Sequence, residues 1–129
     1  MEWSQTYPGL PSMVPAVRAF VRGLLEDSPR VFDAELVASE LVANSLRYTP
    51  SGGTGGEFSI NVSLLPGWSR VAVTDAGTGT WTWPDAALDA VAEYGRGLFL
   101  VEQVADKLGH DVTASGQRLW AEFIWDAES

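Results

Sequence analysis

Two polar side chains lie one helical turn apart within an apolar stretch of this sequence. Glu40 and Asn44 are flanked by Val37, Leu41 and Ala43, and residues four apart share one face of a helix. Burying a carboxylate or a carboxamide among apolar side chains costs free energy unless a partner satisfies it. Two interpretations remain open. Either the pair satisfies each other or caps a neighbouring loop, or Asn44 offers an oxygen to a hard cation while Glu40 handles a proton or a water molecule.

A third candidate, Asp75, ends a predicted strand. Val71, Val73 and Asp75 alternate along this strand, so their side chains point the same way, toward the layer that helices must cover. Gly77 and Gly79 follow at once, and glycines permit close backbone approach or a positive φ. An inward carboxylate followed by two alternating glycines is more than a turn requires.

A glycine-flanked helix start is the fourth feature. Gly95, Arg96 and Gly97 precede an apolar helical pattern that begins at Leu98. Free backbone N–H groups, the positive end of the helix dipole and a guanidinium converge there without intervening side chains. This combination favours an anion and suits phosphate.

Two other stretches do not indicate a site. The segment SGGTGG (51–56) lacks the Gly-Lys-Ser/Thr of a phosphate-binding loop, and a strand follows it instead of a helix; we expect a flexible connection. The lone His110 has no cysteine or second histidine near it in the sequence, so we expect it to be structural.

Apolar periodicity predicts the elements that position these residues. One helix is capped by Ser12 and carries Pro15 in its first turn, and the next carries Glu40 and ends before Pro50. An antiparallel pair of strands is expected over residues 58–64 and 70–75, and a helix over 98–108 that Gly109 ends. The last expected element is a hairpin of strands 110–114 and 117–125, turned by Ser115 and Gly116.

Two connecting segments leave alternatives open. Residues 1–11 are polar and contain prolines, which fits either an edge strand or an arm packed on a partner. The segment 80–93 carries Trp81 and Trp83, and it could be a mobile lid, a contact surface or simply a cover for the edge of the core.

The totals describe one ordinary globular domain over residues 1–129, with 46% hydrophobic and 19% charged residues. There are no cysteines, which excludes disulfides and thiolate metal sites. Neither a membrane span nor a signal peptide is recognisable, so we expect a cytoplasmic protein. The net charge of −9 disfavours nucleic acid as a partner; a phosphate ligand would need focused cations or a metal ion.

Three of these stretches form a recognisable set. In chain order, ELVANSLRYT (40–49), DAGTG (75–79) and YGRGLFLVEQ (94–103) resemble the N, G1 and G2 boxes of the Bergerat-fold ATPase superfamily, which includes gyrase, heat-shock chaperones, histidine kinases and mismatch-repair proteins. The resemblance spans about residues 12–125. Within the superfamily, the chain is most similar to small bacterial anti-sigma factor serine/threonine kinases of the RsbW and SpoIIAB type.

The resemblance implies an α+β fold, a two-layer sandwich whose mixed, mostly antiparallel sheet is covered on one face by about three helices. It also implies roles for single residues. Glu40 matches the general base, Asn44 the Mg²⁺ ligand, and Asp75 the acceptor for the adenine amino group. The remaining matches are Gly77 and Gly79, which line the base and sugar, and Arg47, Gly95, Arg96, Gly97 and Leu98, which lie near the phosphates.

The resemblance implies a protein that binds ATP or ADP together with Mg²⁺. It also implies that the protein phosphorylates a serine of a small antagonist protein and sequesters a sigma factor. A homodimer is a further expectation. The segment 80–93 is shorter than the lid of histidine kinases, and only one glycine precedes Arg96. Two alternatives are therefore a nucleotide-dependent binding module without phosphotransfer and a plain structural domain.

Overall fold

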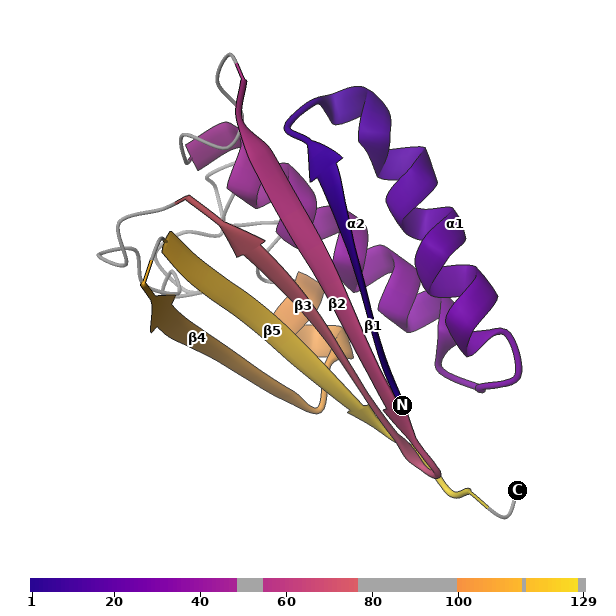
Figure 1. Cartoon of the computed structure of the whole chain (residues 1–129). Coiled ribbons are helices and arrows are strands. Elements are labelled where there is room, and N and C mark those ends of the chain that lie inside the picture. Colours follow the sequence, from indigo (N-terminus) through magenta and orange to yellow (C-terminus); the bar gives the residue numbers. More distant parts are fainter. Residues whose placement is uncertain (49–54, 77–99, 115, 128–129) are drawn as a thin grey trace.

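A computed structural model describes residues 1–48, 55–76, 100–114 and 116–127 of the chain (Figure 1). The elements are β1 (Glu2–Pro8), a 3-10 turn η1 (Pro11–Met13), α1 (Val14–Leu25), α2 (Val31–Tyr48), β2 (Glu57–Leu65), β3 (Trp68–Asp75), β4 (Lys107–Thr113) and β5 (Gly116–Ile124). Residues 100–104 are helical as well.

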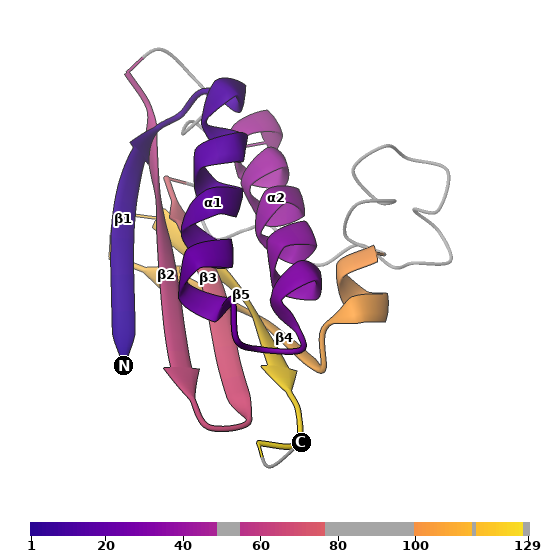
Figure 2. The same cartoon turned by 90° about the vertical axis from the view of Figure 1, so that its right-hand side faces the viewer.

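The strands form one sheet in the order β1-β2-β3-β5-β4. Every pairing within it is antiparallel. The helices α1 and α2 and the helical residues 100–104 all lie on one face of this sheet (Figure 2). The expected α+β two-layer sandwich is therefore confirmed.

The core lies between the helices and the inner face of the sheet. Alternation along the strands places Phe58, Ile60 and Val62 of β2 inward, and the neighbouring strands contribute in the same way. Each fully buried side chain of this size contributes about 1.5–3 kcal/mol. The other buried apolar residues are Val71 and Val73 of β3, Leu119, Ala121 and Phe123 of β5, Val17, Val21 and Leu25 of α1, Ala34, Val37, Ala38, Leu41 and Val42 of α2, and Val31, Ala72 and Val101.

The two hairpins were predicted correctly. The β2–β3 turn passes through Pro66 and Gly67, and Gly67 has a φ of 74°, which glycine adopts without strain. The N–H of Trp125 donates to the carbonyl of Gly67 at 3.0 Å. The second hairpin, β4–β5, turns between Thr113 and Gly116.

The N-terminal residues form the edge strand β1, which pairs with β2 along its whole length. The ring of Tyr7 stacks on Phe58, with centroids 5.4 Å apart. Among the described residues, no helix is long and apolar enough to cross a membrane.

The start of α1 differs from the sequence prediction. Ser12 lies inside η1, and the residue that precedes α1 is Met13, which makes no side-chain capping bond. Pro15 does lie in the first turn. The 3-10 turn supplies backbone hydrogen bonds at this end, such as that from Met13 N–H to the Leu10 carbonyl, so a side-chain cap is not needed.

The helix expected over residues 98–108 is too long at its C-terminal end. Helical structure stops at Val104, and β4 begins at Lys107. Gly109 does not end a helix; it lies in β4 opposite Trp120. A Cβ at this position would lie 1.9 Å from Cζ2 of Trp120, so glycine leaves room for the indole ring.

Candidate functional site

The C-terminal part of α2 packs against the end of β3. Ser45 Oγ donates a hydrogen bond of 2.5 Å to Oδ2 of Asp75. Both residues are buried, with exposures of 0% for Ser45 and 5% for Asp75. This bond places Asp75 beside the turn of α2 that carries Asn44, which immediately precedes Ser45.

The strand β5 approaches Asp75 from the other side. Gln117 lies directly opposite Asp75 in the β3–β5 ladder, and its Nε2 donates to Asp75 Oδ2 over a long 3.5 Å. The Oε1 atom of Gln117 is 2.8 Å from His110 Nε2. Three side chains from three strands are thus connected on the inner face of the sheet.

The close approach of β5 to β3 depends on Gly116. A Cβ at Gly116 would lie 1.8 Å from the carbonyl oxygen of Asp75. No side chain fits at this distance without moving one of the two strands. Glycine at this position therefore holds Gln117 in register with Asp75.

Asn44 is buried, and its side-chain amide makes no hydrogen bond to any described residue. The residue is 6% exposed, and neither Oδ1 nor Nδ2 has a hydrogen-bond partner within the described part of the chain. The interpretation in which Glu40 and Asn44 satisfy each other is therefore wrong. A buried polar group left unsatisfied costs about 1–3 kcal/mol, and a ligand that bonded the amide would offset this cost.

Of the other predicted site residues, the structure describes Glu40 and Arg47. Glu40 is half-buried on α2, one turn before Asn44, and Arg47 lies in the last turn of that helix. The remaining predicted site residues, together with Trp81 and Trp83, lie outside the described residues; those site residues are Gly77, Gly79, Gly95, Arg96, Gly97 and Leu98.

The sequence analysis did not identify Ser45, Gln117 or Gly116 as site residues. Ser45 is a polar residue within the apolar pattern of α2, and Gln117 shares the inward parity of Leu119. Each was a detectable break in an apolar pattern. Their common partner, Asp75, became apparent only once the strand order was known.

Comparison with protein families decides how this arrangement is classified. The family model for the histidine kinase-like ATPase domain matches residues 7–125. The chain belongs to this family. The match runs from β1 to the end of β5 and includes α2 and β3. No curated protein is a significant match.

Membership in the histidine kinase-like ATPase family implies nucleotide binding and a regulatory function. Asn44 fits the associated Mg²⁺, because an amide oxygen is a hard ligand and this one is buried and receives no hydrogen bond from the residues that the structure describes. No cluster of three or more histidine, cysteine or acidic side chains occurs among the residues that the structure describes. A magnesium ion bound at Asn44 would complete its coordination with further oxygen ligands, such as those of phosphates and water.

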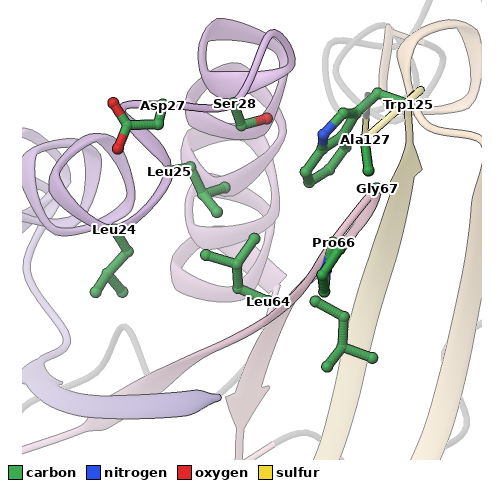
Figure 3. Close-up of a pocket in the computed structure, with 10 residues that line it drawn as sticks. Leu24, Leu25, Asp27, Ser28, Leu64, Pro66, Gly67, Trp125 and Ala127 are labelled. Carbon is green, nitrogen blue, oxygen red and sulfur yellow. The ribbon is translucent and has the colours of Figure 1, made fainter. Parts of the chain in front are cut away.

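This histidine kinase-like ATPase domain also has a cavity at the opposite end of the sheet, near the β2–β3 turn (Figure 3). It has a volume of about 360 Å³. Its lining is mostly apolar and comes from the end of α1, the β2–β3 turn and the residues after β5: Leu24, Leu25, Asp27, Ser28, Leu64, Leu65, Pro66, Gly67, Trp125 and Ala127. None of the predicted site residues that the structure describes lines it.

Proposed function

We propose that the protein binds ATP with Mg²⁺ where the end of α2 meets the end of β3, and that it acts as an anti-sigma factor serine/threonine kinase. The observation that carries this proposal is the pairing of Asp75 with Ser45, next to the unsatisfied amide of Asn44. A buried carboxylate beside a buried, unsatisfied carboxamide suits a ligand with an amine at one end and a metal-bound phosphate tail at the other. Residues 1–129 act in this proposal as a single domain.

Each residue has a role in this proposal. Asp75 accepts a hydrogen bond from the adenine amino group, because an ionised carboxylate only accepts. Asn44 provides an oxygen ligand to Mg²⁺. Backbone amides and cations bind the phosphates; these come from Arg47 in the last turn of α2 and from the G2 box residues Gly95, Arg96, Gly97 and Leu98. Gly77 and Gly79 lie beside the base and sugar.

Glu40 acts as the general base. A serine Oγ of the antagonist protein forms a bond to the γ-phosphorus while the bond between that phosphorus and the β,γ-bridging oxygen breaks, and the serine proton passes to the Glu40 carboxylate. Positioning and charge neutralisation supply most of the acceleration in such transfers. When bound, Mg²⁺ neutralises charge on the phosphates.

The partners in this proposal are a sigma factor, which the protein sequesters, and the antagonist protein that it phosphorylates, with a homodimer as the working assembly. The second candidate function is a nucleotide-dependent binding module of the same fold. The short tryptophan-bearing segment 80–93 favours this alternative, because phosphotransfer requires a lid that closes over the phosphates.

Incubation with ATP labelled at the γ-phosphate, together with candidate antagonist proteins, tests the kinase proposal. We expect serine labelling by the wild type and a loss of about 100-fold or more for Glu40→Ala. The affinity for ADP should stay within about twofold, because a general base contributes little to ground-state binding. Glu40→Gln keeps the side-chain shape and serves as the matched control, with the same loss expected.

Equal labelling by wild type and Glu40→Ala would exclude Glu40 as the base. Binding of ADP by a wild-type protein that labels no antagonist would favour the binding module.

A further inference from the structure

Asp75 receives hydrogen bonds from donors on two different elements. Ser45 of α2 donates to Oδ2 at 2.5 Å, and Gln117 of β5 donates to the same oxygen at 3.5 Å. Gln117 is 1% exposed, so water does not compete freely for its amide. Its other amide atom, Oε1, is next to His110 Nε2 at 2.8 Å.

We infer that His110 and Gln117 are a positioning pair that keeps Asp75 a hydrogen-bond acceptor, and that this pair sets the preference for a nucleotide base carrying an exocyclic amine over one carrying a carbonyl group. The inference rests on the proposed nucleotide function. It adds two residues that lie outside the three sequence boxes.

The direction of each hydrogen bond in this chain follows from the chemistry of the carboxylate. The NH₂ group of Gln117 faces Asp75, because its Nε2 donates to the acceptor oxygen Oδ2 of the carboxylate. The amide oxygen then faces His110, and the imidazole must carry its proton on Nε2 in order to donate to it. A flipped amide would bring its oxygen against the carboxylate, which is unfavourable because both groups are acceptors.

His110 and Asp75 therefore fix the orientation of the Gln117 amide together, one at each of its two atoms. With no donor at position 110, the amide of Gln117 would lose the bond that fixes its orientation. Gly116 contributes to the same arrangement, because it lets β5 approach the carbonyl of Asp75. The register of β5 against β3 and the donor on His110 thus act together to orient the buried amide of Gln117.

The consequence for the ligand concerns the group at C6 of a purine. Adenine carries an amine at C6, which donates to an acceptor such as Asp75. Hypoxanthine carries a carbonyl there, and the two acceptors would face each other unpaired. A site built to bond one group rejects a ligand that lacks it, because the buried polar atoms are then left unsatisfied.

The test compares the affinities for MgADP and for the magnesium complex of inosine diphosphate by calorimetric titration. The two ligands carry the same diphosphate, so their affinity ratio cancels any general effect of protein charge. For Gln117→Glu, we expect the preference for ADP to fall about tenfold or more. Two carboxylates in contact share a proton, and the protonated group becomes a donor to the carbonyl of the inosine base.

His110→Phe removes the donor and retains a planar ring. We expect a smaller fall in the preference, about threefold to tenfold, because the amide of Gln117 can then rotate. His110→Gln restores a donor and should recover part of the preference. A merely structural role for His110 would lower thermal stability without changing the ratio of the two affinities.

The inference is overturned if the wild type prefers ADP but both Gln117→Glu and His110→Phe keep the wild-type ratio within twofold. A wild type that binds neither nucleotide overturns the proposed function and this inference together. A wild type that binds both equally overturns the inference and the adenine-reading role of Asp75, while the binding of a nucleotide by the protein stands. If Gln117→Glu does not unfold cooperatively, the His110 variants, which lie on the half-buried strand β4, decide the outcome.

Discussion

At the scale of single residues, Asn44 has a buried side-chain amide without a hydrogen bond to the described residues. Its two amide atoms are buried and have no partner in the described part of the chain. Folding does not benefit from such a group, since an unsatisfied amide lowers stability. A binding role for Asn44 explains why a carboxamide occupies a position on α2 that an apolar side chain could fill at lower cost.

This explanation predicts opposite effects of Asn44→Ala on stability and on binding. The free energy of unfolding should change by less than about 1 kcal/mol, because the variant loses no hydrogen bond and removes a desolvated amide. The Mg²⁺-dependent part of ATP affinity should fall about tenfold or more. Urea unfolding and calorimetric titration with and without Mg²⁺ measure the two quantities.

A large loss of stability in Asn44→Ala would indicate instead that the amide supports the fold. Ser45→Ala is the neighbouring control. It removes the hydrogen bond to Asp75 and should lower both stability and ADP affinity.

The sequence was sufficient to place Asp75 but not its partners. Alternation of Val71, Val73 and Asp75 predicted an inward carboxylate, and the residue is buried at the end of β3. Ser45 and Gln117 come from different elements, and their contacts depend on the order of strands in the sheet and on where α2 crosses it. Neither property is encoded in local periodicity.

At the scale of elements, Arg30 connects three parts of the molecule near the start of α2. It donates to the carbonyls of Val104 at 2.7 Å and Ile124 at 3.0 Å and pairs with Asp106 at 2.8 Å. Asp106 in turn accepts from the N–H of Ile124 at 2.7 Å. These bonds cap the helical residues 100–104 and fix them against the end of β5.

The same cluster explains why the predicted helix was too long. Val101, Val104, Ala105 and Leu108 repeat with helical spacing, but Leu108 also suits a strand, where it pairs with Ala121. Over so few residues the two periods are compatible. The bond from Arg30 to the Val104 carbonyl and the pairing with β5 decide between them, and both are contacts distant in the sequence.

Asp106 should make the stability of the protein dependent on acid pH. Burial raises its pKa, but the bonds from the Ile124 N–H and from Arg30 outweigh this effect, and the net shift is downward. Because the pKa in the folded state lies below the ordinary aspartate value, the stabilisation is fully present above that ordinary value and is lost as the pH falls through the lowered pKa. For Asp106→Asn we expect a loss of about 1 kcal/mol at neutral pH, kept small by solvent screening, that becomes smaller as the pH falls through the lowered pKa of Asp106.

Urea unfolding at several pH values measures this dependence. Asp27→Asn is the matched control, because Asp27 is exposed and makes no ion pair among the described residues. The explanation fails if the difference between Asp106→Asn and wild type is the same at pH 3 as at pH 7.

At the scale of the whole molecule, the charge distribution limits how a phosphate ligand can bind. The chain has a net charge of −9 and eight basic residues. Five of these, Arg18, Arg22, Arg30, Arg70 and Arg118, pair with carboxylates of the protein. Few cations remain for a phosphate tail, which is why the proposed site requires Mg²⁺.

The overall architecture was predictable because apolar residues alternate along the strands and form one apolar face on each of α1 and α2. These patterns predict one sheet face that is covered by the helices. The antiparallel sheet with helices on one face leaves two ends: one holds Asn44 and Asp75, and the other holds the apolar cavity near Gly67. The sequence did not predict that cavity, because its walls come from three segments that meet only in the folded chain.

Calorimetric titration of MgADP into wild type and Asp75→Asn tests the central claim most directly, with Asp27→Asn as a control that removes the same charge at the opposite end of the sheet. The claim predicts binding by wild type and by Asp27→Asn, and an affinity about 10- to 100-fold lower for Asp75→Asn, since a hydrogen bond to a charged group is lost. Equal affinity of Asp75→Asn and wild type, or no binding by the wild type, would contradict an adenine site at the end of β3.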